Sequence, residues 1–126
     1  MLVNKIIKIE DTVDELVKYA DEKQAENIKV FHVSEKLWIT DYIIIFGVKN
    51  TIHAKSLVTG LEKELKKLDL DKSEDYYSPV KISGNSESGW VILDVNSIII
   101  HCVDEPTRAH YEIDAIFEKQ GDTYHY

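Results

Sequence analysis

The spacing of hydrophobic residues divides the chain into segments of helical and of extended character. Apolar residues recur every three or four positions in three segments, which predicts helices over about Thr12–Gln24, Thr51–Leu68 and Pro106–Lys119. Apolar runs rich in β-branched residues predict strands over Ile28–Val33, Tyr42–Val48, Val80–Ile82, Trp90–Val95 and Ile98–Val103. The predicted order of elements is therefore α-β-β-α-β-β-β-α.

Local signals at the ends of these segments indicate how they connect. Thr12 and Glu15 have the spacing of a helix capping box. Asn96 and Ser97 separate two apolar runs, which predicts a tight antiparallel hairpin. Residues 83–89, with the sequence SGNSESG, are expected to form a flexible loop, and residues from about 120 to 126 a loose tail.

The connections indicate the fold class. The passage from one strand through the second helix to the next strand predicts a parallel pair, and the hairpin adds antiparallel strands. We therefore expect an α+β fold, in which a mixed five-stranded sheet carries flanking helices. The 126 residues contain no internal repeat and suit a single domain.

The net charge of the chain indicates which class of partner it can bind. The formal net charge is −8, and Arg108 is the one arginine among 15 basic residues. Such a surface is poorly suited to neutralising phosphates, so we expect no direct nucleic-acid readout. A basic protein surface is the better electrostatic partner.

Other features bear on the compartment. Cys102 is the single cysteine, which excludes an intrachain disulfide and fits a reducing compartment. The apolar run Tyr42–Val48 is far shorter than the roughly 20 residues of a membrane-spanning helix. Residues 1–8 resemble neither a secretory signal nor a transit peptide. A cytoplasmic protein without membrane association is therefore expected.

Candidate catalytic and metal-binding patterns are weak. Cys102 and His101 are neighbours on a predicted strand, so their side chains point to opposite faces, and Cys102 is interpreted as a buried hydrophobe. The histidines lack metal-ligand spacing, and no phosphate-binding glycine motif is present. Asp69 and Asp71 form a DxD pattern in a polar connector. We predict no cofactor, no metal site and no enzymatic activity.

Several residues are instead suited to binding a protein. Trp90 opens a strand, and alternation places Ile92 and Asp94 on the same face. Trp90 is interpreted either as core or as a hydrophobic anchor, because tryptophan is enriched at interface hot spots. Further candidates are Asp41 and Tyr42 at a loop-to-strand junction, His101, and Arg108 with Tyr111, which are three residues apart on the last helix.

Together these motifs resemble the ribosomal silencing factor family (RsfS, or Iojap-like proteins). The resemblance covers most of the chain, to about Phe117. It rests on Thr40-Asp41-Tyr42 before an isoleucine run, His53, Gly84, Trp90 to Asp94, Ile98 to His101, and Arg108 with Tyr111. The sequence departs from the family pattern at Gly47, Ile52, Ser83 and Asn96, so roles of the family residues missing there are not carried over.

The resemblance implies a fold similar to nucleotidyltransferases without their catalytic residues. It also implies a translational repressor that binds the large ribosomal subunit through large-subunit ribosomal protein fourteen and sterically blocks small-subunit joining. Members often form homodimers, and related organelle proteins act in large-subunit assembly. The partner-binding residues expected here are Trp90, Asp94, Asp41, Tyr42, His101, Arg108 and Tyr111.

Two alternatives remain open from the sequence. A large-subunit assembly factor shares the expected binding site and differs in timing. A nucleotidyltransferase-type enzyme needs Mg²⁺ and nucleotide near Asp69, Asp71 or Asp94. Stabilisation by nucleotide and Mg²⁺ distinguishes the enzyme from the other two.

Overall fold

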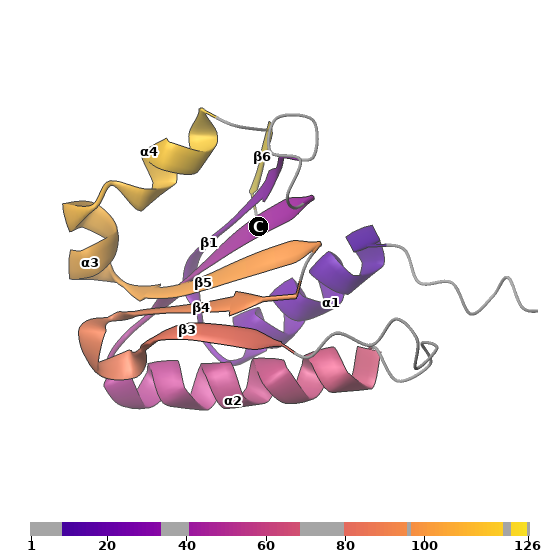
Figure 1. The fold of residues 1–126 in the computed structure, drawn as a ribbon, viewed down its shortest axis with the longest axis horizontal. Coiled ribbons are helices and arrows are strands. Elements are labelled where there is room, and N and C mark those ends of the chain that lie inside the picture. The colour runs from indigo at the N-terminus through magenta and orange to yellow at the C-terminus, as the bar shows by residue number, and fades with distance from the viewer. Residues whose placement is uncertain (1–8, 34–40, 69–79, 96, 120–121, 126) are drawn as a thin grey trace, which may run out of the picture.

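A computed structural model describes residues 9–33, 41–68, 80–95, 97–119 and 122–125. Figure 1 shows their arrangement as one sheet with helices on both sides. The elements are α1 (Ile9–Glu22), β1 (Glu26–His32), β2 (Tyr42–Val48), α2 (Thr51–Leu68), β3 (Lys81–Asn85), a 3-10 turn (Ser86–Ser88), β4 (Trp90–Asp94), β5 (Ile98–Asp104), α3 (Glu105–His110), α4 (Ile113–Glu118) and β6 (Asp122–His125).

The sheet is mixed, as the sequence predicted. Its strand order is β3-β4-β5-β2-β1-β6. β2 and β5 run parallel, while the other neighbouring pairs are antiparallel, including the predicted β4–β5 hairpin. The parallel pair expected from the passage through the second helix is wrong in its partner, because that passage joins β2 to β3, and β3 pairs with β4 at the edge of the sheet. Every residue of β2 is buried, as expected for a strand that is covered on both faces. The predicted α+β class is thus confirmed, and the five predicted strands are all present.

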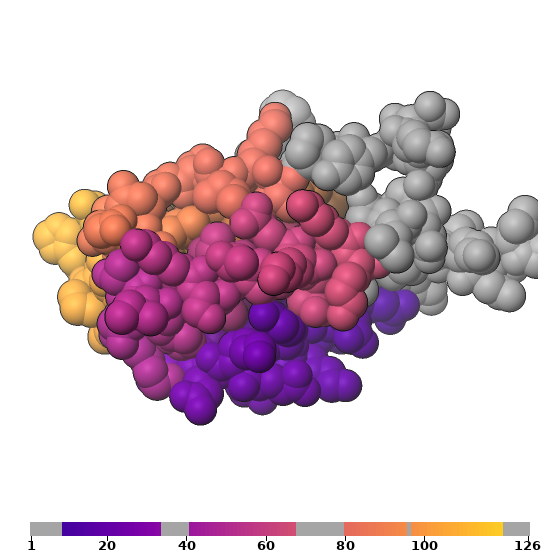
Figure 2. Space-filling view, turned by 90° about the horizontal axis from the view of Figure 1, so that it is seen from below, coloured from indigo at the N-terminus to yellow at the C-terminus, as the bar shows by residue number. Residues whose placement is uncertain are grey.

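The two faces of the sheet carry different cores. On one face, α1 and α2 bury a large apolar cluster that includes Leu16, Phe46 and Leu61. Figure 2 looks onto this side, where α1 and α2 lie side by side. On the other face, α4 contributes Ile113 and Phe117 to a smaller cluster built on Phe31, Ile43 and Ile45.

Two predicted helices differ from the observed ones. α1 begins at Ile9, so Thr12 lies inside the helix and the predicted capping box is wrong. The last helix is not continuous, because Glu112 adopts the left-handed conformation (φ 49°) between α3 and α4. This break turns α4 so that Ile113 is buried against the sheet.

Two predicted flexible segments are ordered. β3 extends through Asn85, whose side chain caps the 3-10 turn by accepting a hydrogen bond from the Ser88 amide at 2.8 Å. The loop prediction is therefore wrong for residues 83–85, which belong to β3, whereas residues 86–89 form the turn that leads to β4. Asp122–His125, expected to lie in a loose tail, form β6 as a sixth strand paired with β1. Without β6, the backbone groups along that edge of β1 would lack ladder partners.

None of the helices in the described ranges is long and apolar enough to cross a membrane.

Candidate protein-binding face

One half of the sheet face on the α3–α4 side is only partly covered. Alternation along β4 places Trp90, Ile92 and Asp94 on this side, while Val91 and Leu93 are buried under α1 and α2. Ile99 of β5 lies opposite Asp94 and is half-buried. We call Trp90, Ile92, Asp94, Ile99 and the adjacent Tyr111 the open face.

Trp90 is held in a defined position on the open face. Its indole Nε1 donates a hydrogen bond to His101 Nδ1 at 3.0 Å. The Tyr111 ring lies 5.5 Å from the Trp90 ring, centroid to centroid. Trp90 is half-buried, so it packs against the smaller core while part of it reaches the surface. Such a preorganised aromatic group loses little conformational freedom on binding.

Two glycines allow the backbone around Trp90 to take this course. Gly84 has a positive φ of 79°, and a Cβ atom there would lie 2.3 Å from the Trp90 carbonyl oxygen. Gly89 has a positive φ of 87°, and a Cβ atom would lie 2.4 Å from Asp104 Oδ2. Side chains at either position would displace β3 or α3 from Trp90.

His101 supports Trp90 from within the structure. It is only 6% exposed, and burial lowers its pKa from 6.5 to about 4. The imidazole is therefore neutral at pH 7. Because Nδ1 accepts the hydrogen bond from Trp90, its proton resides on Nε2. The ring also packs against Phe117, at a centroid distance of 5.1 Å.

The acidic candidates gather at the other end of the face. Asp94 lies opposite Lys81 in the β3–β4 register and is half-buried. The Asp41 amide donates a hydrogen bond to the Ser97 carbonyl at 3.0 Å, which places Asp41 beside the β4–β5 hairpin that Asp94 enters. Asp94 is about 13 Å along the strand from Trp90. The face thus has an aromatic end and an acidic end.

The remaining candidates lie elsewhere. Tyr42 is 6% exposed and stacks on His32, at a centroid distance of 4.7 Å, on the side covered by α1. Arg108 is 7% exposed and binds Asp114, whereas Tyr111 is 55% exposed. Arg108 and Tyr111 thus do not share one exposed surface, because the helix ends at His110 and Tyr111 follows it.

Sequence reasoning missed Ile99 and Ile116. Ile116 is 45% exposed on α4, and Ile99 belongs to the run of three isoleucines that opens β5. Alternation with the buried Ile98 and Ile100 is the signal that separates Ile99 from the core. The uncovered part of the face itself follows from where α3 and α4 dock.

His53 has a structural place in the molecule. Its Nδ1 accepts a hydrogen bond from the Lys49 amide at 2.9 Å, so its Nε2 donates to the Lys23 carbonyl at 2.8 Å. These bonds join the start of α2 to the residue that follows α1. His53 therefore links the turn that precedes α2 to the turn that follows α1.

The chemistry-bearing residues give no catalytic arrangement in the described ranges. Cys102 is buried, and burial raises the pKa of its thiol to about 12, as suits the predicted hydrophobic role. No group of three or more His, Cys, Asp or Glu side chains that could hold a metal ion occurs among the described residues. Asp69 and Asp71 lie outside those residues.

The structure is that of an α+β protein in which one face of the sheet is partly uncovered. A family model described as ribosomal silencing factor during starvation matches residues 6–125. The chain belongs to this family, and the resemblance seen in the sequence is confirmed.

Relatives and solved structures agree with this assignment. Mouse mitochondrial assembly of ribosomal large subunit protein 1 is 31% identical over 83% of the chain; the chain spans 44% of that relative. The ribosomal silencing factor RsfS of Halalkalibacterium halodurans is 22% identical over 80% of each protein. These names point to ribosome-associated regulatory or assembly factors rather than enzymes.

The fold is also that of two crystal structures. A Chromobacterium violaceum protein superimposes with a TM-score of 0.76 at 18% identity, covering 89% of this chain and 88% of its own. A Bacillus halodurans protein gives 0.67 at 18% identity, covering 93% and 99%. At these identities the likeness concerns the fold alone.

Proposed function

We propose that this protein is a translational repressor that binds the large ribosomal subunit through large-subunit ribosomal protein fourteen. While bound, it covers a surface that the small subunit needs for joining, so translation stops by steric exclusion. The family assignment supports the ribosomal partner. The mechanism requires no reaction, and its strength depends on affinity and concentration relative to the competing subunit.

The observation that carries this proposal is the composition of the open face. A tryptophan oriented by His101, an exposed Tyr111 and half-buried isoleucines form an apolar centre of the kind found at interface hot spots. Asp94 and Asp41 give one end of the face negative charge. The net charge of −8 adds long-range attraction to a basic ribosomal protein.

The predicted binding residues take two roles in this proposal. Trp90 is the hydrophobic anchor, Tyr111 extends it, and Asp94 and Asp41 are acidic contacts. The buried residues His101, Arg108 and Tyr42 act as supports, since their side chains are more than nine-tenths covered. His101 orients Trp90 directly, and Arg108 holds α3 against α4 through Asp114.

Sedimentation of ribosomal subunits on sucrose gradients tests the proposal. We expect the protein to travel with the large subunit and to lower the peak of joined ribosomes at a Mg²⁺ concentration that normally permits joining. Protein that stays at the top of the gradient, with joining unchanged at excess protein, contradicts the proposal.

Variants assign the effect to the open face. Trp90→Ala is expected to weaken binding by about 2 kcal/mol or more. Ile52→Ala is the matched control, because Ile52 is an apolar residue 79% exposed at the start of α2, on another element. Thermal unfolding of each variant separates loss of binding from loss of fold. Equal binding by Trp90→Ala and the control contradicts the anchor role.

A role in large-subunit assembly is the second candidate, favoured by the name of the mouse relative. The two functions use one surface and differ in timing. Depletion of the protein in growing cells distinguishes them: an assembly factor leaves immature large subunits, whereas a repressor leaves mature ones. We also propose a homodimer, which light scattering of the purified protein tests.

A further inference from the structure

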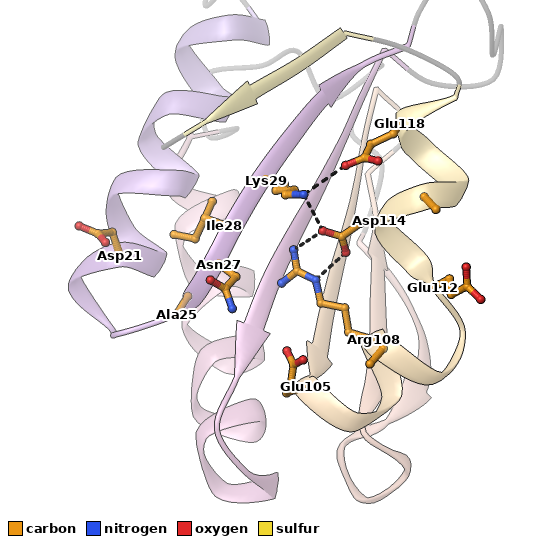
Figure 3. A pocket seen from close by; sticks show the side chains of 12 residues that line it. Asp21, Ala25, Asn27, Ile28, Lys29, Glu105, Arg108, Glu112, Asp114 and Glu118 are labelled. Carbon is orange, nitrogen blue, oxygen red and sulfur yellow. Dashed lines mark hydrogen bonds and ion pairs between the residues drawn. The ribbon is translucent and has the colours of Figure 1, made fainter.

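The strand β3 forms an exposed edge of the sheet. It is the outermost strand beside β4 (Figure 1), and no other strand within the described ranges pairs with its outer side. All five of its residues are exposed. Toward the opposite end of the sheet, β1 is covered, because β6 pairs with it and Lys29 ties it to α4 through Asp114 and Glu118 (Figure 3). An edge such as β3 offers main-chain N–H and C=O groups to a further strand.

The side chains of β3 divide between the two faces of the sheet. In the β3–β4 register, Ile82 lies opposite Leu93 and Ser83 lies opposite Ile92. Residues that oppose each other across an antiparallel pair share a face, so Ile82 lies on the side of α2 and Ser83 on the side of the open face. Ile82 is an apolar residue that is 43% exposed. A further strand beside β3 would remove part of this side chain from water.

The sequence of β3 suits antiparallel pairing with a second copy of itself. A two-fold axis perpendicular to the sheet at Ser83 places this residue opposite its own copy. The same axis places Ile82 opposite Gly84 of the second copy, and Lys81 opposite Asn85 of the second copy. All five residues of β3 are paired in this register, whereas an axis at Ile82 pairs residues 81–83 alone.

The opposed positions in this register are compatible in size and charge. Gly84 is exposed and carries no side chain, so Ile82 of the second copy has room beside it. Although Gly84 has a positive φ, it stays in the β3–β4 ladder opposite Val91. Lys81 is the only charged residue of β3 and meets the neutral Asn85 of the second copy. The register therefore avoids opposed like charges, which would disfavour pairing.

We propose that a second copy of this chain pairs with β3 in this register, so that two sheets join into one. The interface rests on the homodimer proposed above, for which it supplies the contact, and is independent of the ribosomal partner. Because the axis is perpendicular to the sheet, both open faces lie on one side of the joined sheet. The pairing strands are short, so the dimer should dissociate on dilution.

Charge swaps at Ser83 test the register, because this residue opposes its own copy only when the axis lies there. Size-exclusion chromatography with light scattering, over a range of concentrations, gives the dimer Kd. We expect Ser83→Lys and Ser83→Glu each to raise the Kd at least about fivefold, since like charges are then opposed. An equimolar mixture of the two should return to within about twofold of the unaltered protein. Unchanged dimerisation of both single variants overturns the β3 interface.

A cross-link tests the same register by distance. Opposed residues of an antiparallel pair have Cα atoms about 4.5–5.5 Å apart, which a disulfide spans. The single native cysteine, Cys102, is buried, so Ser83→Cys adds an accessible thiol to a chain without another. Diamide, which takes up two hydrogens from two thiols, should give a covalent dimer. Ser56→Cys, exposed on α2, is the matched control, and equal cross-linking of both variants overturns the register.

Two further outcomes separate this interface from the other proposals. Tyr111→Ser alters the open face and should dimerise as the unaltered protein does. Dimerisation lost in Tyr111→Ser and kept in Ser83→Lys assigns the contact to the open face and overturns the β3 interface. Unaltered protein that is monomeric up to about 1 mM overturns both this interface and the homodimer, while ribosome binding is judged separately by sedimentation. Thermal unfolding checks that each variant is folded.

Discussion

The two faces of the sheet belong to the same strands and are nevertheless built differently. The face under α1 and α2 has an apolar core that includes Leu16, Phe46 and Leu61, all fully buried. The face under α3 and α4 has a smaller core and carries a buried histidine and arginine. It also leaves Trp90 half-buried and Ile116 45% exposed.

This difference indicates that the two faces of the sheet have different roles. The long helices α1 and α2, with 14 and 18 residues, together cover their face of the sheet and bury a large apolar cluster against it. The short helices α3 and α4, with six residues each, cannot cover the whole opposite face. The α1–α2 face therefore holds the larger core, and part of the other face stays accessible, where we propose that the partner binds.

The largest expected effect on stability is at the face covered by α1 and α2. Leu61→Ala should lower the free energy of unfolding by about 3–4 kcal/mol, because Leu61 is fully buried in the larger core. Urea denaturation measures this change. Ile116→Ala, on α4, should lower it by less than about 1 kcal/mol. Similar losses at the two positions would remove the distinction between the faces.

The second effect concerns pH and His101. Its pKa is about 4 in the folded protein against 6.5 for the free side chain. The unfolded chain takes up a proton as the pH falls from 6.5 toward 4, and the folded protein does not. The free energy of unfolding should therefore fall over this window, by about 3 kcal/mol at its acid end.

A variant isolates this contribution. Glutamine at this position can accept the Trp90 hydrogen bond and does not titrate, so His101→Gln should flatten the pH dependence between 6.5 and 4. Denaturation at several pH values compares the two proteins. If both lose stability with the same slope, His101 is not the responsible group.

The third effect is at the ion pair that joins α3 to α4. Burial acts to raise the pKa of Asp114, but hydrogen bonds from Arg108 and Lys29 outweigh it and lower that pKa below its ordinary value of 3.8. Hydrogen bonding to Asp114 likewise raises the pKa of Lys29, although burial opposes it. The carboxylate contribution is thus present at neutral pH and is lost only as the pH falls below 3.8.

Asp114→Asn should lower the free energy of unfolding by about 2 kcal/mol at pH 7, because Arg108 stays buried without a counter-charge. The value is below that of a fully buried pair, since the Asp114 side chain is 26% exposed. Glu118→Gln is the control, because the Glu118 side chain is 49% exposed and a surface ion pair contributes little. Equal urea midpoints for both variants would contradict this ranking.

The smallest expected effect on stability is at Tyr111. Tyr111→Ser should change the free energy of unfolding by no more than about 0.5 kcal/mol, since the side chain is mostly exposed. If the open face binds the ribosomal partner, the same variant should weaken binding about tenfold. Loss of stability without loss of binding would assign Tyr111 to the core instead.

The candidate site was predictable where the information is local. Alternation along β4 placed Trp90 and Asp94 on one face, and the register agrees. Alternation could not show that Tyr42 is buried, because a strand buried on both faces has no polar side from which the exposed positions can be identified. It also could not show that Arg108 turns inward, since that depends on Asp114 in the next helix.

Local patterns were enough to predict five of the strands, the first two helices and the family. Tyr42–Val48 and Thr51–Leu68 form the predicted strand and helix with the predicted ends, because their apolar spacing is a local property. The break at Glu112, the pairing of Asp122–His125 with β1 and the half-open face arise from tertiary contacts. Each depends on contacts between segments far apart in the chain, and local patterns carry no information about the energies of those contacts.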